Sequence, residues 1–149
     1  MTKSRNRGFT LIELMMAIAI LGIIAAIAAP SFIQTIRNNR LTATANEVLL
    51  ALQLARAEAI KQRRNLTVCA GQTACTGSAD WSGGWIVTNG DEVIRIWEAR
   101  PSLTVTGPAG GLTFSPDGRG GGTEAITVAS GDSSRTVTVT PTGRASVGH

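Results

Sequence analysis

A long apolar run near the start of the chain limits what this sequence can fold into. After Lys3, Arg5 and Arg7, residues 9–29 carry a single charged side chain, that of Glu13. A helix of these 21 residues is about 31 Å long, close to the thickness of a bilayer's hydrocarbon core. The run therefore predicts a membrane-spanning helix. The basic residues before it predict a cytoplasmic N-terminus, with the rest of the chain on the other side.

Two common kinds of membrane segment, a signal peptide and a plain anchor, each explain only some features of this run. A secretory signal peptide would explain the basic start and the small residues Ala26 to Ala29, but Pro30 would then follow the cut, and the run is long for such a peptide. A plain membrane anchor has no reason to carry Glu13, because a carboxylate at the centre of a membrane helix costs about 2.5–3.5 kcal/mol, and less near its end.

A third interpretation accounts for Gly8, Phe9 and Glu13 together. The segment Gly8-Phe9-Thr10-Leu11-Ile12-Glu13 resembles the class III signal of type IV pilins and pseudopilins. The resemblance implies that a prepilin peptidase cuts between Gly8 and Phe9 and that the new Phe9 amine is N-methylated. In a water-excluding bundle of such helices a carboxylate must be paired. We therefore expect Glu13 to pair with the Phe9 amine of a neighbouring subunit.

The residues after the apolar run predict that the same helix continues. Pro30 removes one backbone hydrogen bond and is expected to kink it. Beyond it, apolar residues recur in steps of three and four, which indicates one buried helical face: Leu41, Ala45, Val48, Leu52, Ala55 and Ala59. We expect one helix from about Phe9 to about Arg64. The expected domains are a cleaved leader (1–8), a transmembrane or filament-core helix (9–30), its amphipathic continuation (31–64) and a β-rich head (65–149).

From Asn65 onward the sequence is typical of short strands and turns. The sequence around Asn89-Gly90-Asp91 predicts a hairpin with a glycine turn. Residues 136–140 alternate Thr with Val, so one face of that strand is expected to be buried. About six strands are predicted: 66–69, 85–88, 92–97, 103–105 with 112–114, 125–128 and 135–140. The predicted fold class is α+β, a long N-terminal helix packed on a small antiparallel β-sheet head.

The distribution of charge and the two cysteines limit which binding partners and which kinds of site this head can have. The net charge is +4, but from residue 65 onward there are five basic and seven acidic residues. The basic excess lies in the leader and in residues 37–64, where it faces either acidic neighbours and phosphates or only solvent. One His and two Cys are too few for a common zinc site. If the head is exported, Cys69 and Cys75 favour a disulfide; two free buried thiols are the alternative.

The head also resembles a known family. The segment Trp81-Ser82-Gly83-Gly84-Trp85-Ile86-Val87 is similar to the tryptophan–glycine–tryptophan segment of the GspH/FimT family. Cys69 and Cys75 stand where that family has a small disulfide loop, and residues 112–119 and 142–144 also fit. The resemblance implies a minor pilin or pseudopilin. For Trp81 and Trp85 we expect simple core packing.

The predicted function is structural: a subunit of a type II secretion pseudopilus or a type IV pilus that helps filament initiation or tip assembly. No catalytic constellation, cofactor or metal site is evident. The expected partners are other pilin-type subunits, the prepilin peptidase and the bacterial inner membrane, with the head in the periplasm. The alternative is a DNA-binding pilin for natural transformation, in which Arg144 would contact DNA. One branch of the GspH/FimT family takes up DNA through a C-terminal Gly-Arg-x-Arg motif, and Gly143-Arg144 resembles the start of that motif. Ser146 stands where the motif has its second arginine, which disfavours this alternative.

Overall fold

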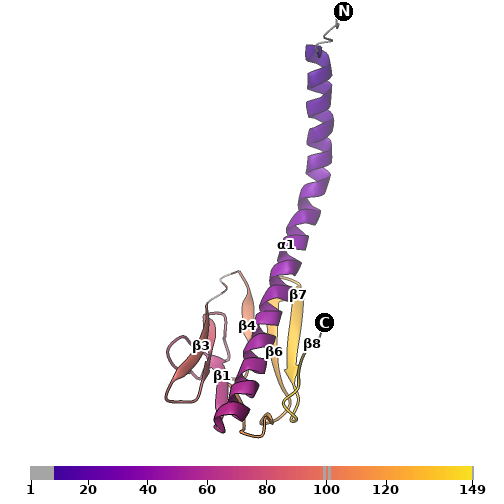
Figure 1. Cartoon of the computed structure of the whole chain (residues 1–149). Helices are drawn as coiled ribbons and strands as arrows, with labels where there is room; N and C mark the ends of the chain where they lie inside the picture. The colour runs from indigo at the N-terminus through magenta and orange to yellow at the C-terminus, as the bar shows by residue number, and fades with distance from the viewer. Residues whose placement is uncertain (1–8, 99, 101, 149) are drawn as a thin grey trace, which may run out of the picture. The chain divides into compact units, whose positions relative to one another are not determined.

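A computed structural model describes residues 9–98, 100 and 102–148. The chain divides into two compact units, one up to Arg37 and a second from Asn38 to the C-terminus. Among the described residues, one helix is followed by eight strands (Figure 1): α1 (Leu11–Gln62), β1 (Leu66–Ala70), β2 (Gly84–Thr88), β3 (Val93–Glu98), β4 (Thr104–Thr106), β5 (Leu112–Phe114), β6 (Glu124–Ser130), β7 (Ser133–Val139) and β8 (Ala145–Gly148).

Helix α1 ends in a backbone motif that stops it abruptly. The Arg64 N–H donates to the Ala59 carbonyl oxygen (3.3 Å), and Arg63 between them has a left-handed φ of 53°. This is the Schellman arrangement, in which glycine usually takes the left-handed position because it has no Cβ. Arg63 is the one non-glycine residue with a positive φ within the described part of the chain. The chain therefore turns sharply from α1 into β1.

Replacing Arg63 with glycine is expected to stabilise the second unit by about 0.5–1 kcal/mol. The left-handed conformation costs an L-residue about 1–2 kcal/mol, part of which is offset by the greater freedom of glycine in the unfolded chain. Thermal unfolding of the full chain in detergent, followed by tryptophan fluorescence, measures the change. Arg64→Gly is the matched control and should be neutral or destabilising. A loss of stability in Arg63→Gly equal to that of the control would contradict this explanation.

The first sheet has the strand order β3-β2-β1-β5, and all its pairs are antiparallel. Its β2–β3 hairpin turns at Asn89, whose Oδ1 accepts hydrogen bonds from the N–H groups of Asp91 (3.0 Å) and Glu92 (2.8 Å). Gly90, at the tip, has a φ of 97°. These bonds close the turn predicted from the Asn-Gly pair.

The second sheet has the order β4-β6-β7-β8 and is also antiparallel. In β7 the side chains of Val137 and Val139 are buried, whereas Thr136 and Thr138 between them are half-buried. The alternation confirms that one face of this strand packs on the core. The Trp81 N–H donates to the Val105 carbonyl oxygen (2.7 Å), which ties the loop before β2 to the second sheet.

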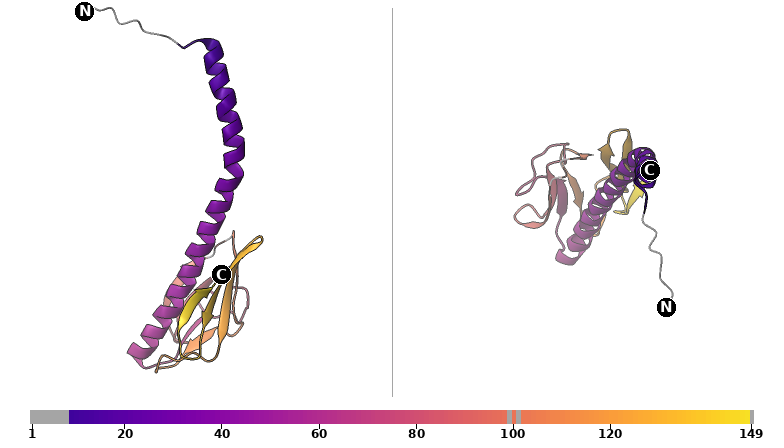
Figure 2. Two further views of the ribbon diagram at one scale, coloured as in Figure 1. Left: turned by 90° about the vertical axis from the view of Figure 1, so that its right-hand side faces the viewer. Right: turned by 90° about the horizontal axis from the view of Figure 1, so that it is seen from above.

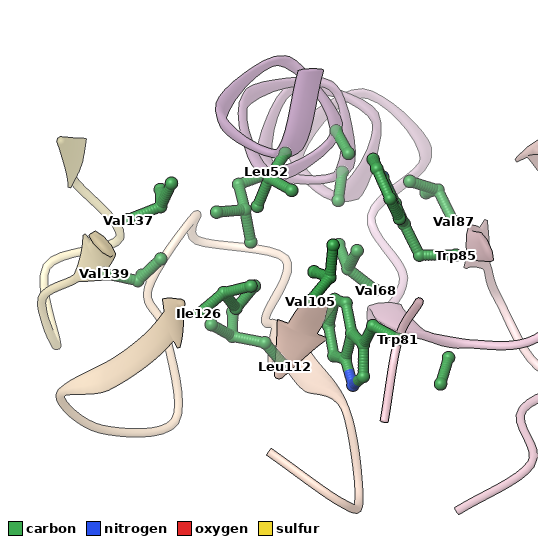
Figure 3. Close-up of a cluster of buried hydrophobic side chains, with 14 of the residues drawn as sticks. Leu52, Val68, Trp81, Trp85, Val87, Val105, Leu112, Ile126, Val137 and Val139 are labelled. Carbon is green, nitrogen blue, oxygen red and sulfur yellow. The ribbon is translucent and has the colours of Figure 1, made fainter. Parts of the chain in front are cut away.

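The core lies between the two sheets and the part of α1 that belongs to the second unit (Figures 1 and 2). All six residues of the predicted helix stripe are buried, and Thr44 and Ala51 join them. Figure 3 shows Leu52 pointing down from α1, with Trp85 and Val87 on one side and Val137 and Val139 on the other. Small side chains on α1 let its backbone approach both sheets closely.

The structure differs from the sequence prediction in two respects. The part of the chain that the structure describes forms eight strands in two sheets, where about six strands in a small sheet are expected. The sequence pattern does not predict strand β8. Its sequence is Ala-Ser-Val-Gly, which has little intrinsic strand preference. It forms because β7 offers it a free edge, which local sequence does not reveal.

Candidate functional site

The start of α1 places the residues singled out for processing and assembly. Gly8 lies outside the described residues, while Phe9 is exposed and stands just before the helix. Glu13 lies in the first turn, where the N-terminal end of the helix dipole favours a negative charge. Phe9 and Glu13 are therefore separated by about one helical turn, on an exposed segment.

Thr10 is a functional residue of this end that sequence analysis missed. The Glu13 N–H donates to Thr10 Oγ1 (3.3 Å), so Thr10 caps the helix. The signal was available, because Thr10-x-x-Glu13 before an apolar run is the capping-box pattern. The N-terminal end of the helix dipole thus gives Glu13 a physical reason to occupy the first turn, besides the expected pairing with an amine.

The first unit presents an apolar surface along its helix from Leu11 to Ile27. α1 is long and apolar enough to cross a membrane, and no residue of its most apolar window is buried within the protein. The exposed side chains include every large apolar residue from Leu11 to Ile27. A surface of this extent is stable only in lipid or against other apolar helices.

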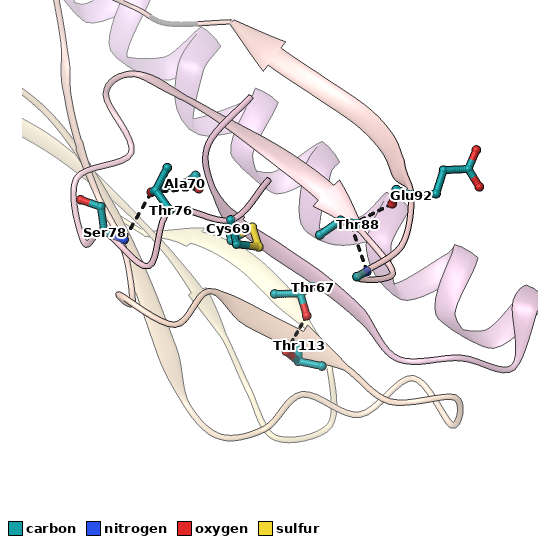
Figure 4. The surroundings of a disulfide bond; sticks show 10 residues. Thr67, Cys69, Ala70, Thr76, Ser78, Thr88, Glu92 and Thr113 are labelled. Atoms are coloured by element: carbon teal, nitrogen blue, oxygen red, sulfur yellow. Dashed lines mark hydrogen bonds between the residues drawn. A yellow bond between two sulfur atoms is a disulfide. The ribbon is translucent and has the colours of Figure 1, made fainter. Parts of the chain in front are cut away.

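A disulfide joins Cys69, at the buried end of β1, to Cys75 on the surface (Figure 4). The loop that it closes is held by the Thr76 N–H, which donates to the Ala70 carbonyl oxygen (2.9 Å), and by the Gly71 N–H, which donates to that of Gly84 (3.1 Å). A Cβ on Gly71 would lie 2.0 Å from the carbonyl oxygen of Ala74. The loop is therefore tightly packed against the start of β2.

Trp81 and Trp85 are both fully buried in the core, as expected for packing residues. Trp81 lies against the backbone of Gly107, where a Cβ would come within 2.6 Å of the indole ring. Trp85 stacks on Trp97 of β3, with ring centroids 6.4 Å apart. The tryptophan–glycine segment thus joins the loop before β2 to both sheets, and it has no exposed functional group.

Two turns of the second unit repeat one pattern that sequence analysis did not notice. Residues 115–119 read Ser-Pro-Asp-Gly-Arg and residues 140–144 read Thr-Pro-Thr-Gly-Arg. In each turn the glycine N–H donates to the carbonyl oxygen of the first residue (2.8 Å), and the N–H of the first residue donates to the arginine carbonyl oxygen (3.0 and 2.9 Å). Both glycines, Gly118 and Gly143, have a φ of 76°.

Arg56 of α1 holds these two turns together. Its Nε donates to the Gly118 carbonyl oxygen (2.9 Å), and its Nη2 donates to that of Thr142 (3.2 Å). A Cβ on Gly143 would lie 1.9 Å from the Gly118 oxygen. Arg56 therefore has a structural role. Of the other basic residues of α1, Lys61 pairs with Glu58 (3.0 Å), so part of the expected basic stripe is neutralised internally.

Arg144, the candidate DNA contact, is exposed and is the last residue of the second turn. It lines a groove of about 400 Å³ together with Arg56, Ile60 and Ala145. Ser146, two residues on, is exposed in β8. Arg56 and Arg144 both line this groove, and the side chain of Arg56 donates hydrogen bonds to backbone carbonyl oxygens.

Asp117 gives the first of the two turns a dependence on pH. The hydrogen bond from the Ser115 side chain holds the pKa of the Asp117 carboxyl below its ordinary value of 3.8. Because the folded pKa is depressed, the stabilisation is present above the ordinary value and is lost as pH falls through the folded value. In Asp117→Asn and in Ser115→Ala, the unfolding free energy of the full chain should therefore fall less steeply below pH 4 than in the wild type. Thermal unfolding at several pH values measures this, and unchanged slopes in both variants would contradict it.

Residues 44–143 match the model of the family described as type II transport protein GspH. That match covers about two thirds of the chain. The chain belongs to the GspH family. Residues 3–29 of this GspH-family protein also match the prokaryotic N-terminal methylation motif, which is the part of the chain that resembles the pilin signal.

Two solved structures and one curated relative are similar to this GspH-family chain. Two crystal forms of the type IV minor pilin FimU of Pseudomonas aeruginosa share its fold, with TM-scores of 0.63 and 0.61 at 23% identity, covering 76% and 73% of this chain and 91% and 93% of theirs. The type IV major pilin PilA of Myxococcus xanthus is 73% identical over 30 residues. That stretch is 20% of this chain and spans only 14% of the relative.

Proposed function

We propose that this GspH-family chain is a minor pilin or pseudopilin, a structural subunit of a type IV filament system. One observation carries the proposal: a single chain joins an N-terminal methylation motif, an exposed apolar helix and a GspH-family domain. The methylation motif and the apolar helix are the features expected of a chain that is inserted into a membrane and later packs with other apolar helices. The GspH-family domain forms a compact unit that remains outside this bundle of apolar helices.

The finer parts of the proposal concern processing and topology. The prepilin peptidase cuts between Gly8 and Phe9, and the Phe9 amine is methylated. Residues 9–30 span the inner membrane before assembly, residues 31–64 continue the helix, and residues 65–149 lie in the periplasm. The Cys69–Cys75 disulfide supports this location, because disulfides persist in oxidising compartments. The subunit acts in filament initiation or at the tip.

The proposed role is structural and not enzymatic. Within the described residues no three His, Cys, Asp or Glu side chains gather in a way that could hold a metal ion. For DNA uptake, no observation favours a proposal: Arg144 stands near Ser146 instead of a second arginine, and Arg56 beside it binds backbone carbonyls. A single arginine contributes one weak, salt-sensitive phosphate contact.

Processing provides the direct test of this proposal. Intact-mass spectrometry of the membrane-extracted chain should show loss of residues 1–8 and gain of one methyl group. The control is Gly8→Arg, which should leave the chain at full length. A mature chain that starts near Pro30 would instead identify an ordinary signal peptide and contradict the proposal.

A further inference from the structure

We propose that the groove between α1 and β3 is a docking site for another pilin-type subunit, which inserts an apolar side chain flanked by a carboxylate. This β3 groove is lined by Leu50, Leu54, Arg95 and Trp97. The inference rests on the proposed function, because it requires neighbouring subunits, and it adds the surface and the chemistry of the contact.

The β3 groove exposes apolar surface that the core does not fully cover. Leu50 is 57% exposed, the highest value among the exposed large apolar residues described in the second unit, although Leu52, two residues on, is fully buried. Leu54 lies one helical turn from Leu50 and therefore on the same face of α1. Trp97 is half-buried, with one side of its ring on Trp85. Covering these side chains would remove apolar surface from water.

Arg95 gives the β3 groove a positive edge. Its guanidinium lies over the Trp97 ring, 5.5 Å from the centroid, so the cation is held at the groove by a cation–π contact. The ion pairs found among the described residues join Lys61 to Glu58 and Arg100 to Glu47, which leaves Arg95 without a carboxylate there. A carboxylate on the partner would complement this charge. Tryptophan and arginine are also the residue types most enriched where binding energy concentrates in protein interfaces.

The size and setting of the groove favour a protein over a small molecule. Its volume is about 240 Å³, below the range of about 300–1,000 Å³ that is typical of small-ligand pockets, and Arg95 is its one charged group. β3 is also the terminal strand of its sheet as described, so the groove runs beside a strand edge that no described strand covers. Such an edge is a common place for another chain to dock.

Photocrosslinking in the full chain tests this contact. A benzoylphenylalanine replaces Leu50 in cells that assemble the filament, and the matched control replaces Ile96. Ile96 is 49% exposed and pairs with Ile86, so it lies on the face of β3 away from Trp97. We expect a light-dependent adduct from position 50 only. Peptide mapping should place it on another pilin-type subunit, at an apolar residue within about four positions of an Asp or Glu.

A charge-reversal pair tests the role of Arg95. Arg95→Glu should lower the yield of that adduct at least about tenfold, because it sets two carboxylates against each other. Changing the partner's Asp or Glu to Arg should restore the yield. Arg135→Glu, in the second sheet, is the control and should leave the adduct unchanged. Tryptophan fluorescence verifies that each variant is folded.

The β3 groove proposal is wrong if position 50 gives adducts with lipid alone, with a second copy of this chain alone, or with no protein. It is also wrong if Arg95→Glu has no effect. Recovery of the wild-type chain in isolated filaments separates the two proposals. A chain that is present in filaments without an adduct at position 50 overturns only the docking site, whereas a chain that is absent from filaments overturns both.

Discussion

Replacing Glu13 with alanine is expected to reduce incorporation of the chain into filaments by about 100-fold or more, while cleavage and methylation continue. In the proposed assembly the methylated Phe9 amine and Glu13 of adjacent subunits lie in a water-free bundle of helices. Removing one partner of a buried pair costs about 3–5 kcal/mol, because the other charge is left unpaired. Quantitative immunoblotting of sheared filaments against membranes measures the change.

Two controls separate the pairing of Glu13 from its place in the capped first turn. Thr10→Ala removes the cap but keeps the carboxylate, and the loss of a cap costs only about 1 kcal/mol. It should leave incorporation within a few-fold of the wild type. Glu47→Ala removes an acid that pairs with Arg100 in the second unit (2.6 Å) and should have no effect. If Glu13→Ala enters filaments normally, or if Thr10→Ala is equally defective, the pairing account is wrong.

Replacing Gly143 with alanine is expected to destabilise the second unit by about 3–5 kcal/mol. The left-handed φ alone costs an L-residue about 1–2 kcal/mol. The new Cβ would also lie 1.9 Å from the Gly118 oxygen, so one of the two turns must move. That movement breaks the hydrogen bonds from Arg56, and hydrogen bonds to a charged group contribute about 1.5–3 kcal/mol each. Thermal unfolding of the full chain, followed by tryptophan fluorescence, measures the loss.

Gly90→Ala provides the matched control for this prediction. Gly90 also has a positive φ, of 97°, but a Cβ there meets nothing within 4 Å. Its replacement should therefore cost only the conformational part, about 1–2 kcal/mol. Equal losses in the two variants would show that the contact between the two turns contributes nothing to stability.

Short-range patterns in the sequence are sufficient for much of this fold. The stripe from Leu41 to Ala59 is buried as predicted, because helical periodicity depends only on the spacing of apolar residues. The hairpin at Asn89 is confirmed for a similar reason, since its turn is closed by bonds within four residues. Thr10 could have been predicted in the same way, from its spacing to Glu13.

Features that depend on distant segments were not predictable in this way. β8 forms at the edge of β7 in spite of a weak strand sequence, and the division into two sheets depends on which strands share an edge. In the sequence, Arg56 looks like one more cation on a basic helix. Its hydrogen bonds nevertheless reach Gly118 and Thr142, which lie 62 and 86 positions further along the chain. The β3 groove likewise requires α1 and β3 to lie side by side.

The central claim is that this GspH-family chain is a subunit of an assembled filament. The most direct measurement is peptide mass spectrometry of filaments sheared from cells and purified away from membranes. We expect these filaments to contain an N-terminal peptide of this chain that begins with N-methyl-Phe9. Filaments that lack the chain, in cells whose membranes contain its mature form, would contradict the claim.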